Sequence, residues 1–519
     1  MPENDAVSRR TFLKGSAAVV AAAAVSTIPV TSSAAASAAA ELEFASAFEA
    51  AAAIRKKKIS SVELTKAVLA RIDRFNPKLN AIVTLTADQA LERARAADGA
   101  LAKGQVWGAF HGVPCTIKDS FEVEGVRTTC GAKELANYVP KQDAVCVARY
   151  RKAGAVILGK TNVPTYAADW QSYNDIFGTT NNPWDVTRTP GGSSGGEAAA
   201  IASGLSYFGV GSDIGGSLRV PADFCGIYAH KSSVDVVPMK GHIPPPPGVT
   251  DIPLHLPVAG PLARNAEDLR ALLEVLGGPV EADQVAYRWS LPAARHLRLS
   301  EFRVGYVLDD KNAPVSSEVR SGLEETVRAL QKAGVKTEEG WPQGVNLTEE
   351  YLTYVELLAP IISGGPPPDL FQKAPLPPPK NIGEAFAFAP YAPHIYYFRV
   401  MAARENAGAA WREYFKTHDV FLMPVATVPA FPHDHSQPMP ARTLNTPEGP
   451  RPYTDTLFWA GFATMTGFPA TAAPVGFTSG GLPLGVQILG PWLEDATPIE
   501  FAAQLSKVIG GYKPPKGYA

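Results

Sequence analysis

The sequence predicts an α/β fold in which helices cover a central sheet of mostly parallel or mixed strands. Helix-like and strand-like patterns of apolar residues alternate along almost the whole chain, as they do in layered α/β domains. The chain has 519 residues, of which 46% are hydrophobic and 19% charged, so it can bury a sizeable core. It shows no repeat at the periods of solenoids or propellers.

Composition limits the kind of partner that the protein can have. The formal net charge of −2 leaves no basic footprint for nucleic acid and no acidic tail. The 46 prolines favour many ordered loops over long uninterrupted helices. We therefore expect a globular protein that does not bind nucleic acid.

Residues 1–40 are expected to be a targeting segment. Arg9 and Arg10 form a twin-arginine signature, which is followed by an apolar run to about Val25 and by small residues up to Ala40. A transmembrane anchor is the alternative, but the run is short and rich in alanine. We expect cleavage around Ala36 or Ala40 and export to the periplasm or the medium, with no membrane span left afterwards.

The export route affects whether the four cysteines can form disulfides. Twin-arginine export carries folded proteins, so these side chains would meet a reducing cytosol while the chain folds. No structural disulfide is therefore expected among Cys115, Cys130, Cys146 and Cys225.

The elements after the signal can be predicted in order. Residues 44–58 and 61–74 have helical spacing, with Ser60 or Ser61 as N-cap and Pro77 as the end of the second helix. Residues 79–86 are predicted as a strand and 87–102 as a helix. A short buried strand over 113–119 would deliver Lys118 and Asp119 to its C-terminal end. The alternation continues through 144–152, 155–158, 267–276, 303–308, 317–333, 420–423, 484–489 and 499–509.

Proline-rich patches at 244–247, 366–368 and 375–379 interrupt this alternation. Prolines stiffen a segment and aromatic rings offer apolar surface to a ligand. Residues 363–397 are therefore predicted to form a packed loop that borders a ligand pocket, the alternative being rings that fill the core beneath a long loop. The segment gathers six aromatic residues: Phe371, Phe386, Phe388, Tyr391, Tyr396 and Tyr397.

Two serine clusters flanked by glycine lie between Arg188 and Pro221. Ser193 and Ser194 stand between two glycine pairs, and Ser217 follows Gly215 and Gly216. A serine in a turn whose free N–H groups point at one place has the geometry that acyl transfer needs. A Gly/Ser linker does not explain the stretch, because residues 197–202 are good helix formers and an apolar run follows them.

Three motif matches compete with this interpretation. Residues 154–161 fit the phosphate-loop pattern GxxxxGK[ST], but a helix pattern precedes them and Pro164 lies where the following helix should begin, so nucleotide binding is rejected. Residues 191–195 fit the GxSxG nucleophile elbow of serine esterases, which needs an acid and a histidine downstream; many histidines follow, none in a recognisably catalytic stretch. Residues 433–435 (His-Asp-His) lack a third ligand, so no metal site is expected.

Lys118 is a candidate base for a serine nucleophile. Serine reacts poorly near neutral pH unless a base takes its proton, and a buried lysine with a depressed pKa can do so. Lys118 follows an apolar run, where desolvation would lower its pKa. The alternative is an exposed lysine at the strand end, paired with Asp119.

These motifs together resemble the amidase signature family. The matching stretches are residues 112–119 (GVPCTIKD), 178–185 (GTTNNPWD), 188–196 (RTPGGSSGG), 212–221 (SDIGGSLRVP), 466–470 (TGFPA) and 481–488 (GLPLGVQI). They extend over about residues 60–495, and the central block is highly specific. The resemblance implies a single α/β domain over residues 41–519, with a central mixed sheet covered by helices.

The resemblance also implies roles for individual residues. Ser217 would be the nucleophile, Ser193 the bridging serine after a cis peptide bond at Gly192–Ser193, and Lys118 the base. Ser194 and Asp213 would support them. The backbone amides of Ile214, Gly215, Gly216 and Ser217 would form the oxyanion hole. No metal or organic cofactor is implied.

The chain departs from the family pattern after the nucleophile. The family usually has Lys-Pro-Ser/Thr-x-Gly, whereas Lys231 is followed here by Ser-Ser-Val-Asp, so the resemblance does not define the local turn.

The expected activity is hydrolysis of a small-molecule amide, and also of esters, through an acyl-enzyme. An amidotransferase subunit is an alternative within the family, against which the export signal argues. An exported binding protein without activity is another, against which the intact Lys118, Ser193 and Ser217 argue. Neither the identity of the substrate nor the formation of a homodimer can be read from the sequence.

Overall fold

A computed structural model describes residues 33–247, 254–280, 282–362 and 379–519. One mixed sheet of 11 strands runs through them in the order β1-β3-β2-β6-β8-β7-β14-β15-β11-β9-β10, which confirms the predicted fold class. Its strands are β1 (Ile82–Leu85), β2 (Pro114–Lys118), β3 (Val156–Thr161), β6 (Phe208–Asp213), β7 (Tyr228–Lys231), β8 (Val258–Ala263), β9 (Arg303–Tyr306), β10 (Lys336–Glu339), β11 (Val420–Pro424), β14 (Ala470–Phe477) and β15 (Pro483–Leu489). Two small hairpins lie outside it: β4 (Tyr173–Asn174) with β5 (Gly178–Thr179), and β12 (Thr443–Thr446) with β13 (Gly449–Pro452).

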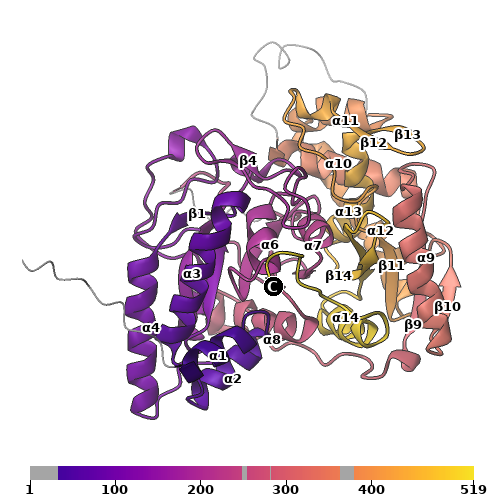
Figure 1. Ribbon diagram of the computed structural model, residues 1–519. Coiled ribbons are helices and arrows are strands. Elements are labelled where there is room, and N and C mark those ends of the chain that lie inside the picture. The colour runs from indigo at the N-terminus through magenta and orange to yellow at the C-terminus, as the bar shows by residue number, and fades with distance from the viewer. Residues whose placement is uncertain (1–32, 248–253, 281, 363–378) are drawn as a thin grey trace, which may run out of the picture.

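Helices surround this sheet, as Figure 1 shows. Those of the first hundred residues gather on one side of the molecule, and α9 lies at the opposite edge beside β9 and β10. The helices are α1 (Ser33–Glu41), α2 (Ala47–Arg55), α3 (Ser61–Leu79), α4 (Ala87–Ala102), α5 (Val145–Lys152), α6 (Gly195–Ala202), α7 (Arg219–Cys225), α8 (Ala266–Leu276), α9 (Ser317–Lys332), α10 (Leu347–Ile362), α11 (Ile382–Phe388), α12 (His394–Tyr414), α13 (Thr456–Thr466) and α14 (Ala496–Ile509). Within the described ranges, none of them combines the length and the apolar character needed to cross a membrane.

Local sequence rules explain the start of α3 but not its end. Ser60 is the N-cap, and Glu63 completes a capping box with it. Pro77 does not end the helix as predicted, because α3 continues to Leu79 and stops at Asn80 in the left-handed conformation (φ 50°). The buried side chains of Phe75 and Leu79 keep the last turn helical, and a proline there removes only one backbone hydrogen bond.

Residues 379–397 are largely helical, which differs from the loop predicted for 363–397. They contribute α11, a short 3-10 turn and the start of α12. The stretch 363–378, including Phe371, lies outside the described residues, as do residues 1–32 of the predicted signal peptide. Residues 38 and 39 in α1 pack against the core, although they belong to the segment that the sequence assigns to the signal.

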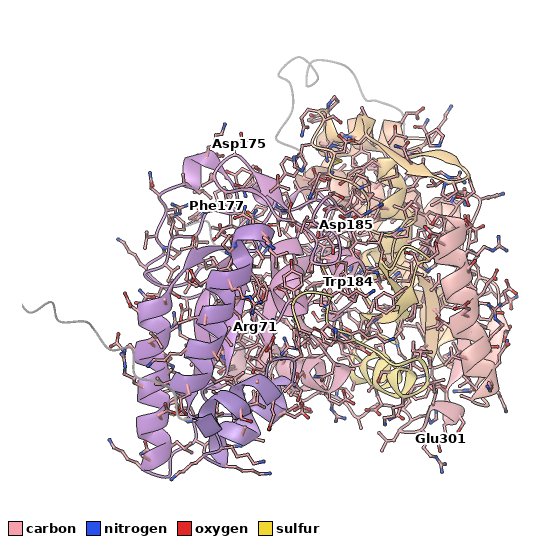
Figure 2. All side chains as sticks on the ribbon, viewed as in Figure 1. Arg71, Asp175, Phe177, Trp184, Asp185 and Glu301 are labelled. Atoms are coloured by element: carbon pink, nitrogen blue, oxygen red, sulfur yellow. The ribbon has the colours of Figure 1, made fainter. Side chains whose placement is uncertain are left out.

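The C-terminal tail connects distant parts of the chain. Arg71 on α3 points toward this tail, near the centre of the view in Figure 2, and donates hydrogen bonds to the carbonyls of Ser203 (2.8 Å) and Tyr518 (2.7 Å). Its guanidinium also forms an ion pair with Glu43. Trp184 anchors its loop in the same manner, because its indole N–H donates to the carbonyl of Cys225 at 2.9 Å.

Candidate active site

Two neighbouring parallel strands of the sheet, β2 and β6, end side by side. Strand β2 pairs with β6 in the register Thr116–Gly209 and Ile117–Val210. The last residues of these strands, Lys118 and Asp213, therefore reach the same edge of the sheet. The serine loops follow there: Ser193 lies just before α6, and Ser217 just before α7.

Lys118 is fully buried at this edge. Its Nζ lies 2.7 Å from Ser193 Oγ and 3.0 Å from Ser212 Oγ. Burial lowers the pKa of Lys118 to about 7, although Cys130, Asp213 and Glu197 act in the opposite direction. Near neutral pH this amine is therefore neutral in a large part of the molecules and can accept a proton.

The Ser193 loop has the backbone that the resemblance implies, with a cis peptide bond between Gly192 and Ser193. Glycine is required at 192, because a Cβ atom there would lie only 2.5 Å from the carbonyl oxygen of Asp169. Ser172 holds the loop from the other side: its hydroxyl donates to the carbonyl of Gly191 (3.1 Å) and accepts from the N–H of Gly195 (3.0 Å).

Ser194 connects the two serine loops. Its N–H donates to the carbonyl of Ser217 at 3.2 Å, and its hydroxyl contacts the carbonyl of Ser212 at 3.4 Å. Ser217 is 6% exposed as a residue, so the proposed nucleophile is nearly enclosed.

Asp213 shapes the Ser217 loop through a buried ion pair. Arg219 donates to both carboxylate oxygens, at 2.7 and 3.0 Å, and the N–H groups of Gly216 (2.9 Å) and Leu218 (3.0 Å) donate to them as well. Burial opposes ionisation of Asp213, but Arg219 and the two amides outweigh it and lower the pKa to about 2. The loop is thus built around a permanent carboxylate.

The peptide groups before Ser217 are oriented by large side chains. The hydroxyl of Tyr354 donates to the carbonyl of Ile214, and the indole N–H of Trp170 donates to the carbonyl of Gly215, both at 2.7 Å. Of the four amides predicted for the oxyanion hole, that of Gly216 already donates to Asp213. It could serve an oxyanion only as a shared donor, which leaves the amides of Ile214, Gly215 and Ser217 as the principal candidates.

The structure does not favour the competing motifs. A nucleophile elbow places its serine between a strand and a helix. Residues 180–194 contain no strand, whereas Ser217 does lie between β6 and α7. In the phosphate-loop match, the middle residues form β3, and Lys160 is buried in an ion pair with Asp119 at 3.1 Å.

The histidines of residues 433–435 have protein partners. His433 Nε2 donates to Asn181 Oδ1 at 3.1 Å, and the ring of His435 stacks on Tyr173 at 3.7 Å between centroids. Among the residues that the structure describes, no group of three or more His, Cys, Asp or Glu side chains is arranged to hold a metal ion. The four cysteines are free and buried.

The residues after Lys231 depart from the family pattern but still form a turn. Asp235 occupies the position where the family pattern has glycine, and it adopts the left-handed conformation (φ 66°), which Asp tolerates better than most residues. Ser233 anchors the segment, since its hydroxyl donates to Asp495 at 2.6 Å. Lys231 is buried, and its Nζ donates to the carbonyls of Ser232 and Phe468, both at 2.9 Å.

Sequence reasoning missed several residues that complete the site. Ser212 and Arg219 stand inside a matched motif and could have been noted there. Tyr354, Trp170 and His242 carry no local signal, because only the tertiary structure brings them to the serine loops.

Comparisons with known proteins show the family of this chain. Residues 63–363 and 373–498 match the protein family described as Amidase, and residues 6–26 match the signal sequence of the twin-arginine translocation pathway. Over 488 residues the chain is 31% identical to a glutamyl-tRNA(Gln) amidotransferase subunit from Moorella thermoacetica, and this match covers 89% of the chain and 96% of the relative.

Solved structures of similar fold include one described as an amidase, with a TM-score of 0.72, 26% identity, and coverage of 90% of this chain and 100% of that one. A bacterial aryl acylamidase of the amidase signature family has a TM-score of 0.75 at 22% identity, with coverage of 92% and 98%, which speaks for the fold alone. The family match spans most of the chain. The chain therefore belongs to the amidase family.

Proposed function

We propose that the protein hydrolyses carboxylic amides of small molecules through a covalent intermediate on Ser217, with Ser193 as the bridging serine and Lys118 as the base. The observation that carries this assignment is the contact of 2.7 Å between Lys118 Nζ and Ser193 Oγ in a buried site where the lysine pKa is about 7. A base whose pKa lies near the working pH suits general acid–base catalysis.

The reaction would proceed in two stages. Neutral Lys118 takes a proton through Ser193 as Ser217 Oγ attacks the carbonyl carbon, and the amides of Ile214, Gly215 and Ser217 hold the oxyanion. The proton returns through Ser193 to the leaving nitrogen as the C–N bond breaks. Water then attacks the acyl-enzyme by the same path and releases the acid. Apart from substrate and water, every group used belongs to the chain.

An apolar cavity lined in part by α10, the helix that contacts the Ser217 loop, suggests the kind of substrate. Helix α10 carries Tyr354, which contacts the carbonyl of Ile214, and then Leu357 and Ile361, which follow at helical spacing and line a cavity of about 630 Å³. We propose that this cavity receives an apolar part of the substrate. Tyr396 and Tyr397 line it too, which keeps the described end of the segment 363–397, residues 389–397, as a candidate wall of the acyl pocket.

Glu356 and Tyr396 form a polar pair within the mostly apolar lining. The hydroxyl of Tyr396 donates to Glu356 Oε1 at 2.6 Å, and burial raises the pKa of Glu356. A substrate with a hydrogen-bond donor on an otherwise apolar body fits this wall better than a purely aliphatic one.

An amidotransferase subunit is a second candidate, favoured by the name of the Moorella relative. Such a subunit would act inside the cell with partner subunits, which the signal sequence at residues 6–26 disfavours. We propose instead that residues 41–519 act alone or as a homodimer in the periplasm or the medium.

The assignment is tested by incubating the purified chain with aryl and alkyl amides and the matching esters, and by labelling it with a fluorophosphonate probe. We expect hydrolysis of apolar amides and label on Ser217. No turnover across the panel, with no label, would favour a binding protein without activity. Activity that requires added subunits would favour the amidotransferase.

A further inference from the structure

A continuous chain of hydrogen bonds leads from a backbone carbonyl to the proposed base. His242 Nδ1 lies 3.0 Å from the carbonyl oxygen of Pro244, and its Nε2 lies 2.9 Å from Ser212 Oγ. Ser212 Oγ in turn lies 3.0 Å from Lys118 Nζ, which contacts Ser193 Oγ at 2.7 Å. All four side chains are buried.

The carbonyl at one end fixes the direction of every bond in this chain. A carbonyl oxygen only accepts, so His242 Nδ1 must carry the proton. Burial and the charge of Lys118 lower the pKa of His242 to about 3, so the ring is neutral and Nε2 is an acceptor. Ser212 must therefore donate its only hydroxyl proton to Nε2, which leaves its oxygen as an acceptor for Lys118.

This direction decides how neutral Lys118 is oriented. A neutral amine has two N–H bonds and one lone pair. One N–H is directed to Ser212 Oγ, and the carbonyl of Ser212, 3.5 Å away, can accept the other. The lone pair then remains for the hydroxyl proton of Ser193. Without His242, Ser212 could rotate and donate its own proton to that lone pair, in competition with Ser193.

The imidazole cannot easily turn away from this arrangement. Its ring packs edge to face on Phe121, with 4.9 Å between centroids. The loop that carries it is tied to the segment after β2, since Ile243 N–H donates to the carbonyl of Ser120 at 2.7 Å. Lys118 is the charged group that acts on the imidazole, and the acidic residues in the wall of the cavity that His242 lines are Asp235 and Asp283.

We propose that His242 is a positioning residue that acts through Ser212 and holds the lone pair of Lys118 toward Ser193. It touches no reacting atom. The inference deepens the proposed function and rests on Lys118 being the base.

Substitution at position 242 separates this role from simple packing. We expect H242L to lower kcat about three- to tenfold at saturating substrate, with little change in KM, since one orienting hydrogen bond is lost. H242Q should recover most of the loss, because its amide oxygen can accept from Ser212. In an S212A background, H242L should cause no further loss, because the residue through which it acts is gone. Equal losses in both backgrounds, or wild-type kcat in H242L, would overturn the proposal.

The tautomer can be measured on the unmodified protein, so the test does not depend on a variant that folds. Nitrogen-15 NMR of labelled histidine should show His242 with a protonated Nδ1 and an unprotonated Nε2 from pH 5 to 9, with H242Q identifying the signal. A protonated Nε2 would refute the chain of hydrogen bonds whatever the substrate proves to be. Absence of amide hydrolysis in the wild type would instead refute the proposed function and leave the tautomer unaffected.

Discussion

Lys118 and Lys160 are buried on the adjacent strands β2 and β3, yet Lys160 contacts a carboxylate and Lys118 contacts neutral serine hydroxyls. Lys160 Nζ forms an ion pair with Asp119 Oδ1 at 3.1 Å and donates to Thr128 Oγ1 and to the carbonyl of Phe121. Lys118 Nζ has serine oxygens as its hydrogen-bond partners. Burial lowers the pKa of both amines, but only Lys160 has a contacting carboxylate to offset it. One strand thus holds a structural cation and its neighbour a candidate base.

Substituting methionine for each lysine should have opposite effects on stability. K118M removes an amine that is costly to bury in its charged form, so we expect a melting temperature equal to or above that of the wild type at pH 7. K160M leaves the buried carboxylate of Asp119 without its cation and should destabilise by about 3–5 kcal/mol. Thermal and urea unfolding of both variants measures this contrast. Destabilisation of K118M as large as that of K160M would contradict it.

The advantage of K118M should also depend on pH. The pKa of Lys118 is about 7 in the folded state, below the ordinary 10.5. Between these values the unfolded chain binds a proton that the folded chain does not, so this group makes wild-type unfolding free energy rise with pH. The advantage of K118M should therefore be greatest below pH 7 and fade toward pH 10.5. An advantage that grows with pH would contradict the lowered pKa.

Activity should depend on the same proton. Only neutral Lys118 can act as a base, so kcat/KM is expected to rise with pH and level off above an apparent pKa of about 7. The check is a pH–rate profile with an uncharged amide, with K118M as the inactive control. A midpoint near 10 would mean that burial does not lower the pKa, and a flat profile down to pH 5 would assign the base elsewhere.

Ser217→Ala should abolish amide hydrolysis, with a fall in kcat of at least about 10³-fold, and leave the fold intact. S206A is the matched control, because Ser206 is also buried but donates to the carbonyl of Phe208 away from the site. Circular dichroism should be unchanged in both variants. Fluorophosphonate label that persists in S217A on Ser193 or Ser194 would restore the nucleophile-elbow hypothesis.

The cavity is tested by changing its wall. Tyr397 lines it, whereas Phe386 packs against the core. Y397A should change the ratio of kcat/KM between short and long acyl chains, because it alters the space offered to the substrate. F386A should lower the melting temperature and change kcat/KM by the same factor for every substrate. If Y397A also changes kcat/KM by the same factor for every substrate, the cavity does not hold the acyl chain.

Export should depend on the twin arginines, which a receptor reads. Replacing Arg9 and Arg10 by lysine is expected to keep the protein in the cytoplasm. Cell fractionation shows where it accumulates, and mass spectrometry of the exported wild type should find an N-terminus between Ala34 and Glu41. An exported protein that still begins at Met1 or Pro2 would contradict cleavage of the signal.

The alternation of helices and strands, the serine loops and the position of Lys118 at a strand end could all be predicted from the sequence. These features depend on residues that are close in the chain: apolar periodicity, the capping serine at position 60 and glycines beside the two serines. The end of α3 could not be predicted in this way, because packing of Phe75 and Leu79 outweighs the local preference of Pro77.

The chemistry that the serines and the lysine can share depends on the tertiary structure. The parallel pairing of β2 with β6 brings Lys118 to Ser212, and loops far away in the chain supply Tyr354, Trp170 and His242. The lowered pKa of Lys118 likewise arises from burial, which depends on all the elements packed around the strand. Hydrogen bonds and desolvation act through space, so residues distant in the sequence complete a site whose proposed nucleophile and base the sequence had already indicated.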